Sequence, residues 1–143
     1  MSSKAFASVQ KSFIGESENV FSFLIADFGF AGPERTDEIL QEVSYARPGM
    51  RCRVGLDHSE MSVMTEVEVE HGDTLMIARL DNLVSAAGIA SGNRVPRNVH
   101  TVKSLRKVLA EQAGFLRALL PYLEQETVSD LMEHSRARQR RIR

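Results

Sequence analysis

The sequence predicts an α+β fold in which an antiparallel meander of three to four strands is covered on one face by helices. Residues 63–70 alternate between β-branched and polar side chains, which is the period of a half-buried strand. Residues 102–123 instead repeat leucine and valine at helical spacing. Because the strands are grouped between helices, the expected order is one helix, three or four strands and then three helices.

The N-terminal part has a less regular pattern than the rest of the chain. Residues 1–16 show no clean period, and we expect them to form a weakly ordered arm. A first helix is expected over 18–28, because Ser17 is a residue type that caps helices and apolar side chains then recur every three or four positions. Gly29 is expected to end this helix, since glycine readily adopts the left-handed conformation.

The strands are expected in the middle of the chain. Residues 39–46 and 51–56 both alternate, and Pro48-Gly49 between them is a turn signal. The third strand covers 63–70, and residues 74–78 are expected to add a short fourth strand after a turn at 71–73. Short connections favour antiparallel pairing of neighbours.

The remainder is expected to be helical up to a basic tail. A short helix starts at Asp81, a loop covers 88–100, and the long helix runs from Thr101 to residue 123. Thr127 opens a last short helix. We therefore expect a single domain over 17–135, preceded by the arm 1–16 and followed by a tail over 136–143.

Charge is distributed unevenly along the 143 residues, although the formal net charge is only −1. Residues 1–75 carry 6 basic and 13 acidic side chains, whereas residues 91–143 carry 11 basic and 5 acidic ones. The folded body is thus expected to be acidic, which attracts basic partners and repels nucleic acid.

The sequence offers no set of residues that predicts catalysis or cofactor binding. Cys52 is the single cysteine, so an internal disulfide is excluded, and it alternates in phase with Val54 and Leu56 as a buried residue would. The four histidines lack the spacing of a metal site. We expect no catalytic, cofactor or metal residues, and no enzyme. Without an apolar run that suits a membrane span or a signal peptide, a cytoplasmic protein is expected.

Two charged segments are candidates for binding. Glu66, Glu68 and Glu70 lie on one face of the third strand, where they form either a solvated row or a docking patch for a basic partner. The C-terminal tail holds the candidate nucleic-acid contacts, which are Arg136, Arg138, Arg140, Arg141 and Arg143. Such an arm without aromatic residues supports salt-sensitive, nonspecific binding, so nucleic acid is not the expected partner.

The order of elements resembles that of small α+β immunity proteins of bacterial polymorphic toxin systems. The resemblance covers about residues 17–135, and its most distinctive part is segment 21–30, which ends in Asp27-Phe28-Gly29-Phe30. Residues 80–84 and the long helix follow in the same order. The resemblance implies a stoichiometric inhibitor that binds a toxin and blocks its active site, without catalytic residues of its own.

An interface with a basic toxin is expected to use the acidic strand and the turn after it. The candidate residues are Glu66, Glu68, Glu70 and Asp73. Charge steering would mainly raise the association rate. Two other classes remain open, a cytoplasmic chaperone or adaptor for a secreted protein and a nucleic-acid-associated regulator that uses the arginine tail. The sequence leaves the oligomeric state open.

Overall fold

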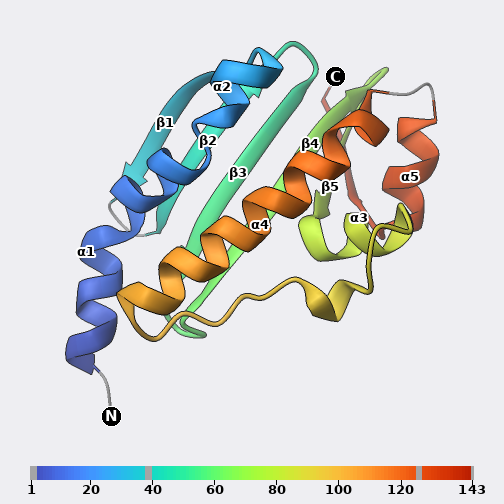
Figure 1. Cartoon of the computed structure of the whole chain (residues 1–143). Coiled ribbons are helices and arrows are strands. Elements are labelled where there is room, and N and C mark those ends of the chain that lie inside the picture. Colours follow the sequence, from blue (N-terminus) through green and yellow to red (C-terminus); the bar gives the residue numbers. More distant parts are fainter. Residues whose placement is uncertain (1–2, 38–39, 125–126, 143) are drawn as a thin grey trace.

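The computed structural model describes residues 3–37, 40–124 and 127–142 and contains one antiparallel sheet of six strands in the order β1-β2-β3-β4-β5-β6 (Figure 1). The strands are β1 (Ala31–Asp37), β2 (Gln41–Arg47), β3 (Met50–Asp57), β4 (Ser62–His71), β5 (Thr74–Arg79) and β6 (Arg138–Arg141). The helical elements are α1 (Ser3–Val20), α2 (Phe23–Phe28), α3 (Leu80–Ala86), η1 (Gly92–Arg94), α4 (Val102–Leu123) and α5 (Val128–His134). The α+β class and the antiparallel meander are therefore confirmed.

Alternation of side chains explains the central strands. Val63, Thr65 and Val67 of β4 are fully buried, whereas Glu66 between them lies on the opposite face of the sheet. The turn between β2 and β3 contains Pro48-Gly49, and Gly49 has φ of 78°, which matches the third position of a type II turn. The register follows from this turn, because it places Arg47 opposite Met50.

The two longest helices lie on the same side of the sheet, where α4 crosses the strands diagonally (Figure 1). Helix α4 starts at a capping box between Thr101 and Ser104 and buries a continuous stripe of its apolar side chains. Gln112 is the one polar member of that stripe. Its amide nitrogen donates to the backbone oxygens of Val63 and Pro96, so the polar group in the core is satisfied and ties α4 to β4.

The N-terminal segment is a helix where the sequence analysis expected a weakly ordered arm. Helix α1 runs from Ser3 to Val20, and it buries Phe6, Val9 and Phe13 in the core. Three apolar residues at this spacing give little helix signal on their own, and packing against the sheet and α4 supplies the stability. Ser17 lies within α1 and is not an N-cap. The expected helix over 18–28 is divided between α1 and α2, and Gly29, at φ of 74°, ends α2 as predicted.

The sheet has more strands than the three or four expected. Strand β1 was missed because it is polar and contains Pro33, a combination typical of an edge strand. Strand β6 was missed because it consists of the basic segment Arg138–Arg141, which was expected to be a tail. Both strands are held by backbone pairing to one neighbour, and neither buries side chains that would produce an alternating pattern. Of the helices that are described, none has the length and apolar composition needed to cross a membrane.

Candidate functional site

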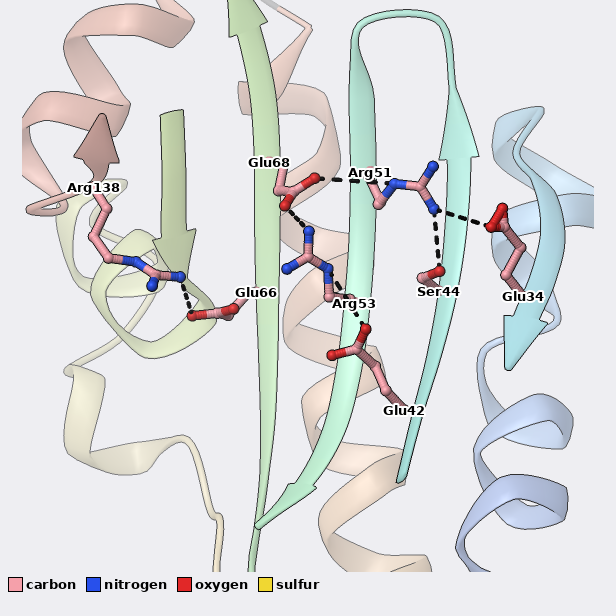
Figure 2. A network of polar contacts seen from close by, with 8 residues as sticks. All are labelled: Glu34, Glu42, Ser44, Arg51, Arg53, Glu66, Glu68 and Arg138. Carbon is pink, nitrogen blue, oxygen red and sulfur yellow. Dashed lines mark hydrogen bonds and ion pairs between the residues drawn. The ribbon is translucent and has the colours of Figure 1, made fainter. Parts of the chain in front are cut away.

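The sheet face opposite α1 and α4 is covered with charged side chains. We call this surface the charged face and define it by the eight residues drawn in Figure 2, which are Glu34, Glu42, Ser44, Arg51, Arg53, Glu66, Glu68 and Arg138. They come from five strands, the consecutive strands β1 to β4 and the C-terminal strand β6. Strand pairing brings them together, because Arg53 lies opposite Glu66 and Arg51 lies opposite Glu68 across β3 and β4.

Glu68 is the centre of the ion pairs on this face. Its side chain is only 10% exposed, and its carboxylate pairs with the guanidinium groups of Arg53 and Arg51, the latter at 4.0 Å. Arg53 also reaches Glu42 at 3.7 Å. A carboxylate with so little access to water is stabilised only while such partners are present, so these side chains hold one another in place.

Arg51 extends the network toward the β1 edge of the sheet (Figure 2). Its guanidinium lies 3.7 Å from a carboxylate oxygen of Glu34 and donates to the Ser44 hydroxyl at 3.1 Å. Toward the other edge, Arg138 of β6 donates to Glu66 at 3.2 Å. The linked residues from Glu34 to Glu42 and the separate Arg138–Glu66 pair thus lie on strands from β1 to β6, and each arginine has a glutamate beside it.

The environment of Glu42 differs from that of the other carboxylates. Burial raises the pKa of the Glu42 carboxyl above its ordinary value, the positive charge of Arg53 opposes this, and the negative charge of Glu66 adds to it. The surroundings of Glu42 thus disfavour its ionised form, and an additional cation beside it would favour that form.

A hollow lies beside this network, at the end of the face where Gly55 interrupts the rows of side chains. It has a volume of about 420 Å³, and its lining includes Leu40, Glu42, Arg53, Gly55, Met64 and Glu66. We call it the Gly55 hollow. It exists because Gly55 sits between Glu42 and Met64 in adjacent strands and has no side chain of its own. A second hollow of about 210 Å³ lies between Ala46, Arg51, Glu68 and Leu75.

The structure separates the four acidic residues that the sequence singled out. Glu66 and Glu68 are paired with arginines and are not a free acidic row. Glu70 and Asp73 are exposed at the end of β4 and in the turn to β5. The expectation of a wet, purely acidic strand face is therefore corrected, because arginines from β3 and β6 neutralise it. The role of these residues in an interface stays a prediction.

The expected arginine tail is largely part of the sheet. Arg138 and Arg140 pair with Ile77 and Leu75 of β5, and Arg141 pairs with Thr74. Arg136, which precedes the strand, is exposed and has φ of 59°. Arg143 lies outside the described residues. Arg51 and Arg53 were not among the candidate residues, although their alternation with Cys52 and Val54 is a signal that both lie on the open face of the strand.

Other groups with reactive side chains lie apart from this face. Cys52 is buried on the opposite side of β3, and burial raises the pKa of its thiol to about 12, which keeps the sulfur protonated. Asp27 lies in the last turn of α2 and accepts a hydrogen bond from Arg117 of α4 at 2.8 Å. In the part of the chain that the structure describes, no three His, Cys, Asp or Glu side chains gather as metal ligands would.

No family model matches this chain, and no match was found among the curated proteins or the solved structures compared with it. The functional proposal therefore rests on the charged face and on the two hollows beside it.

Proposed function

We propose that the protein is a non-catalytic binding module that uses the charged face to bind and neutralise a protein toxin, as expected of an immunity protein. The observation that carries this proposal is the array of opposite charges that spans the open side of a sheet whose other side is buried. A toxin that covers this array would be inhibited by occlusion, a mode of action that requires a rigid complementary surface and no reaction centre.

The size of the face suits a protein partner. Six strands at a spacing of about 4.8 Å span roughly 24 Å, and the 10 residues of β4 extend about 34 Å. Because the other strands have only 4 to 8 residues, the sheet covers roughly 700 Å², which is close to the area of about 800 Å² that each partner contributes to a protein–protein interface of standard size.

The ion pairs favour specific binding because they order the side chains before the partner arrives. Binding a flexible side chain costs about 0.5–1.5 kcal/mol in lost rotamer freedom, and a side chain already held by two neighbours loses less. A fixed mosaic of both signs also selects against partners with a different pattern, since like charges that meet at an interface are strongly unfavourable.

Exposed acidic residues at the ends of the strands favour a basic toxin. Asp57 and Glu60 lie exposed at the β3–β4 turn, and Glu70 and Asp73 lie exposed at the β4–β5 turn, where Arg140 and Arg141 of β6 are their neighbours. Such charges raise the association rate of a basic protein even when they form few direct contacts.

The proposal is tested by capture followed by a growth assay. The tagged protein is used to isolate its partner from the producing cells, and the partner is then expressed alone and together with this chain. We expect growth arrest in the first case and rescue in the second. A partner that is harmless alone would contradict the immunity proposal, and its export by a secretion system would favour the chaperone alternative.

A pair of matched variants locates the surface. Ala46→Trp adds bulk to the open side of β2 without removing an ion pair, whereas Ala110→Trp adds the same bulk to the exposed side of α4. We expect Ala46→Trp to abolish rescue and complex formation, with thermal unfolding used to confirm that both variants are folded. Equal rescue by the two variants would remove the charged face from the interface.

A further inference from the structure

We infer that the Gly55 hollow receives one arginine or lysine side chain of the protein partner. The inference deepens the proposed function and rests on it, because the partner that covers the charged face supplies this side chain. The hollow has about 420 Å³ of space, which falls within the range of roughly 300–1,000 Å³ that is usual for pockets that hold small groups.

The walls of the hollow suit the aliphatic part of a long side chain. Leu40 is 59% exposed beside it, and Met64 lines it from β4. Between them the floor is Gly55, where a Cβ atom would find its nearest side-chain neighbour, a Glu42 carboxylate oxygen, 3.8 Å away. A hydrocarbon stem would therefore cover apolar surface and meet no obstructing side chain.

The charges that line the hollow favour a cation. Three carboxylates line it, those of Glu42, Asp57 and Glu66, against the single guanidinium of Arg53. Arg53 is shared between Glu42 and Glu68, Arg138 lies against Glu66, and one oxygen of Asp57 accepts from the backbone nitrogens of Ser59 and Glu60 and from the Ser59 hydroxyl. The negative excess remains after these contacts are counted.

Other kinds of side chain fit the hollow less well. An acidic side chain would add a fourth carboxylate to those already present. A purely apolar side chain would remove water from Glu42 and Arg53 without giving either a new polar partner. A lysine or arginine side chain suits both the apolar walls and the carboxylates. Its aliphatic stem covers Leu40 and Met64, and its positive charge lies beside the carboxylates.

The test is an NMR titration of the ¹⁵N-labelled full chain with two short peptides. One is acetyl-Gly-Gly-Arg-Gly-Gly-amide, and the other carries citrulline, which has nearly the same shape without the charge. We expect the arginine peptide to shift the amide signals of Gly55 and Met64 with a dissociation constant of about a millimolar, as suits a small ligand on an open surface. The citrulline peptide is expected to leave these signals in place.

Variants make the test specific for the hollow. The double change Glu42→Gln and Glu66→Gln should weaken arginine-peptide binding about fivefold to tenfold, and Gly55→Leu should abolish it by filling the space. The control Gly114→Leu adds the same side chain to an open position on α4 and should leave binding unchanged. Equal shifts with both peptides, or shifts that cluster away from Gly55 and Met64, would overturn the inference.

The outcome also separates this inference from the proposed function. If Ala46→Trp prevents toxin binding but the arginine peptide does not bind at Gly55, the proposed function stands and the inference fails. If the arginine peptide binds at Gly55 while Ala46→Trp leaves toxin binding intact, the charged face is not the toxin-binding surface, and the partner named by the inference is wrong.

Discussion

At the scale of single residues, Glu68 decides the character of the charged face. It is the most buried carboxylate of the network and the one that joins Arg51 to Arg53. The period of β4 places Glu68 on the open side of the sheet, but only the register with β3 shows that two guanidinium groups lie beside it. Glu68, which the sequence suggests as part of an acidic docking patch, therefore also holds Arg51 and Arg53 in place.

We predict that Glu68→Gln lowers the free energy of unfolding by about 1–3 kcal/mol, because the amide removes the charge that Arg51 and Arg53 share and leaves each with a single carboxylate partner, Glu34 or Glu42, at 3.7 Å. Urea denaturation measures the change. The control is Glu111→Gln on the exposed side of α4, which should have little effect. An unchanged midpoint for Glu68→Gln would show that Arg51 and Arg53 are solvated well enough without it.

Glu42 gives the charged face a dependence on pH. Its pKa is raised in the folded protein above the value of 4.5, so the folded state binds more protons than the unfolded state just above that pH. Ionisation of Glu42 therefore opposes folding, and its contribution to stability falls as the pH rises through the raised pKa. We predict that the unfolding free energy of the wild type, minus that of Glu42→Gln, decreases from pH 4 toward neutrality. A constant or increasing difference in urea titrations would contradict this prediction.

At the scale of elements, the strands with a buried face were predictable and the edge strands were not. In β3 and β4 one side of the strand is buried and the other is open. Apolar and polar residues therefore alternate along the sequence, and this alternation can be read from hydropathy. Strands β1 and β6 bury almost nothing, so their sequences carry only turn residues or charge. Their place in the sheet is fixed by backbone hydrogen bonds to β2 and β5, which any sequence without an obstructing proline can form.

Helix α1 has only a weak apolar period in its sequence, and packing against the rest of the core stabilises it. We predict that Phe13→Ala lowers the free energy of unfolding by about 3–5 kcal/mol, because Phe13 is fully buried and its removal leaves a cavity. Chemical denaturation measures the loss, and Lys11→Ala on the exposed side of the same helix provides the control. A loss below about 1 kcal/mol would show that α1 is not part of the core that unfolds cooperatively.

At the scale of the whole molecule, the fold redistributes the charge that the sequence shows. The N-terminal half is acidic, yet the open side of the sheet has nearly balanced charge, because arginines of β3 and β6 meet the glutamates of β2 and β4. Exposed acidic residues remain at the turns, Asp57 and Glu60 between β3 and β4, and Glu70 and Asp73 between β4 and β5 beside Arg140 and Arg141. Attraction of a basic partner and recognition by the face are therefore carried by different residues.

We predict that the double change Glu70→Lys and Asp73→Lys slows association with a basic toxin by about tenfold at low salt and changes the dissociation rate little. Surface plasmon resonance at two ionic strengths checks this, since the effect of exposed charges should shrink as salt screens them. Glu111→Lys is the control on the opposite side of the protein. An unchanged association rate would mean that the β4–β5 turn does not face the approaching partner.

Local periodicity along the chain is enough to predict the α+β class, the face of β4 on which its glutamates lie, and the burial of Cys52. The pairing of charges depends instead on the folded chain, since cross-strand neighbours are set by register and by the return of the C-terminal segment to the edge of the sheet. The Gly55 hollow likewise depends on the register of neighbouring strands. A glycine within a strand becomes a hollow only when the adjacent strands carry large side chains on either side of it.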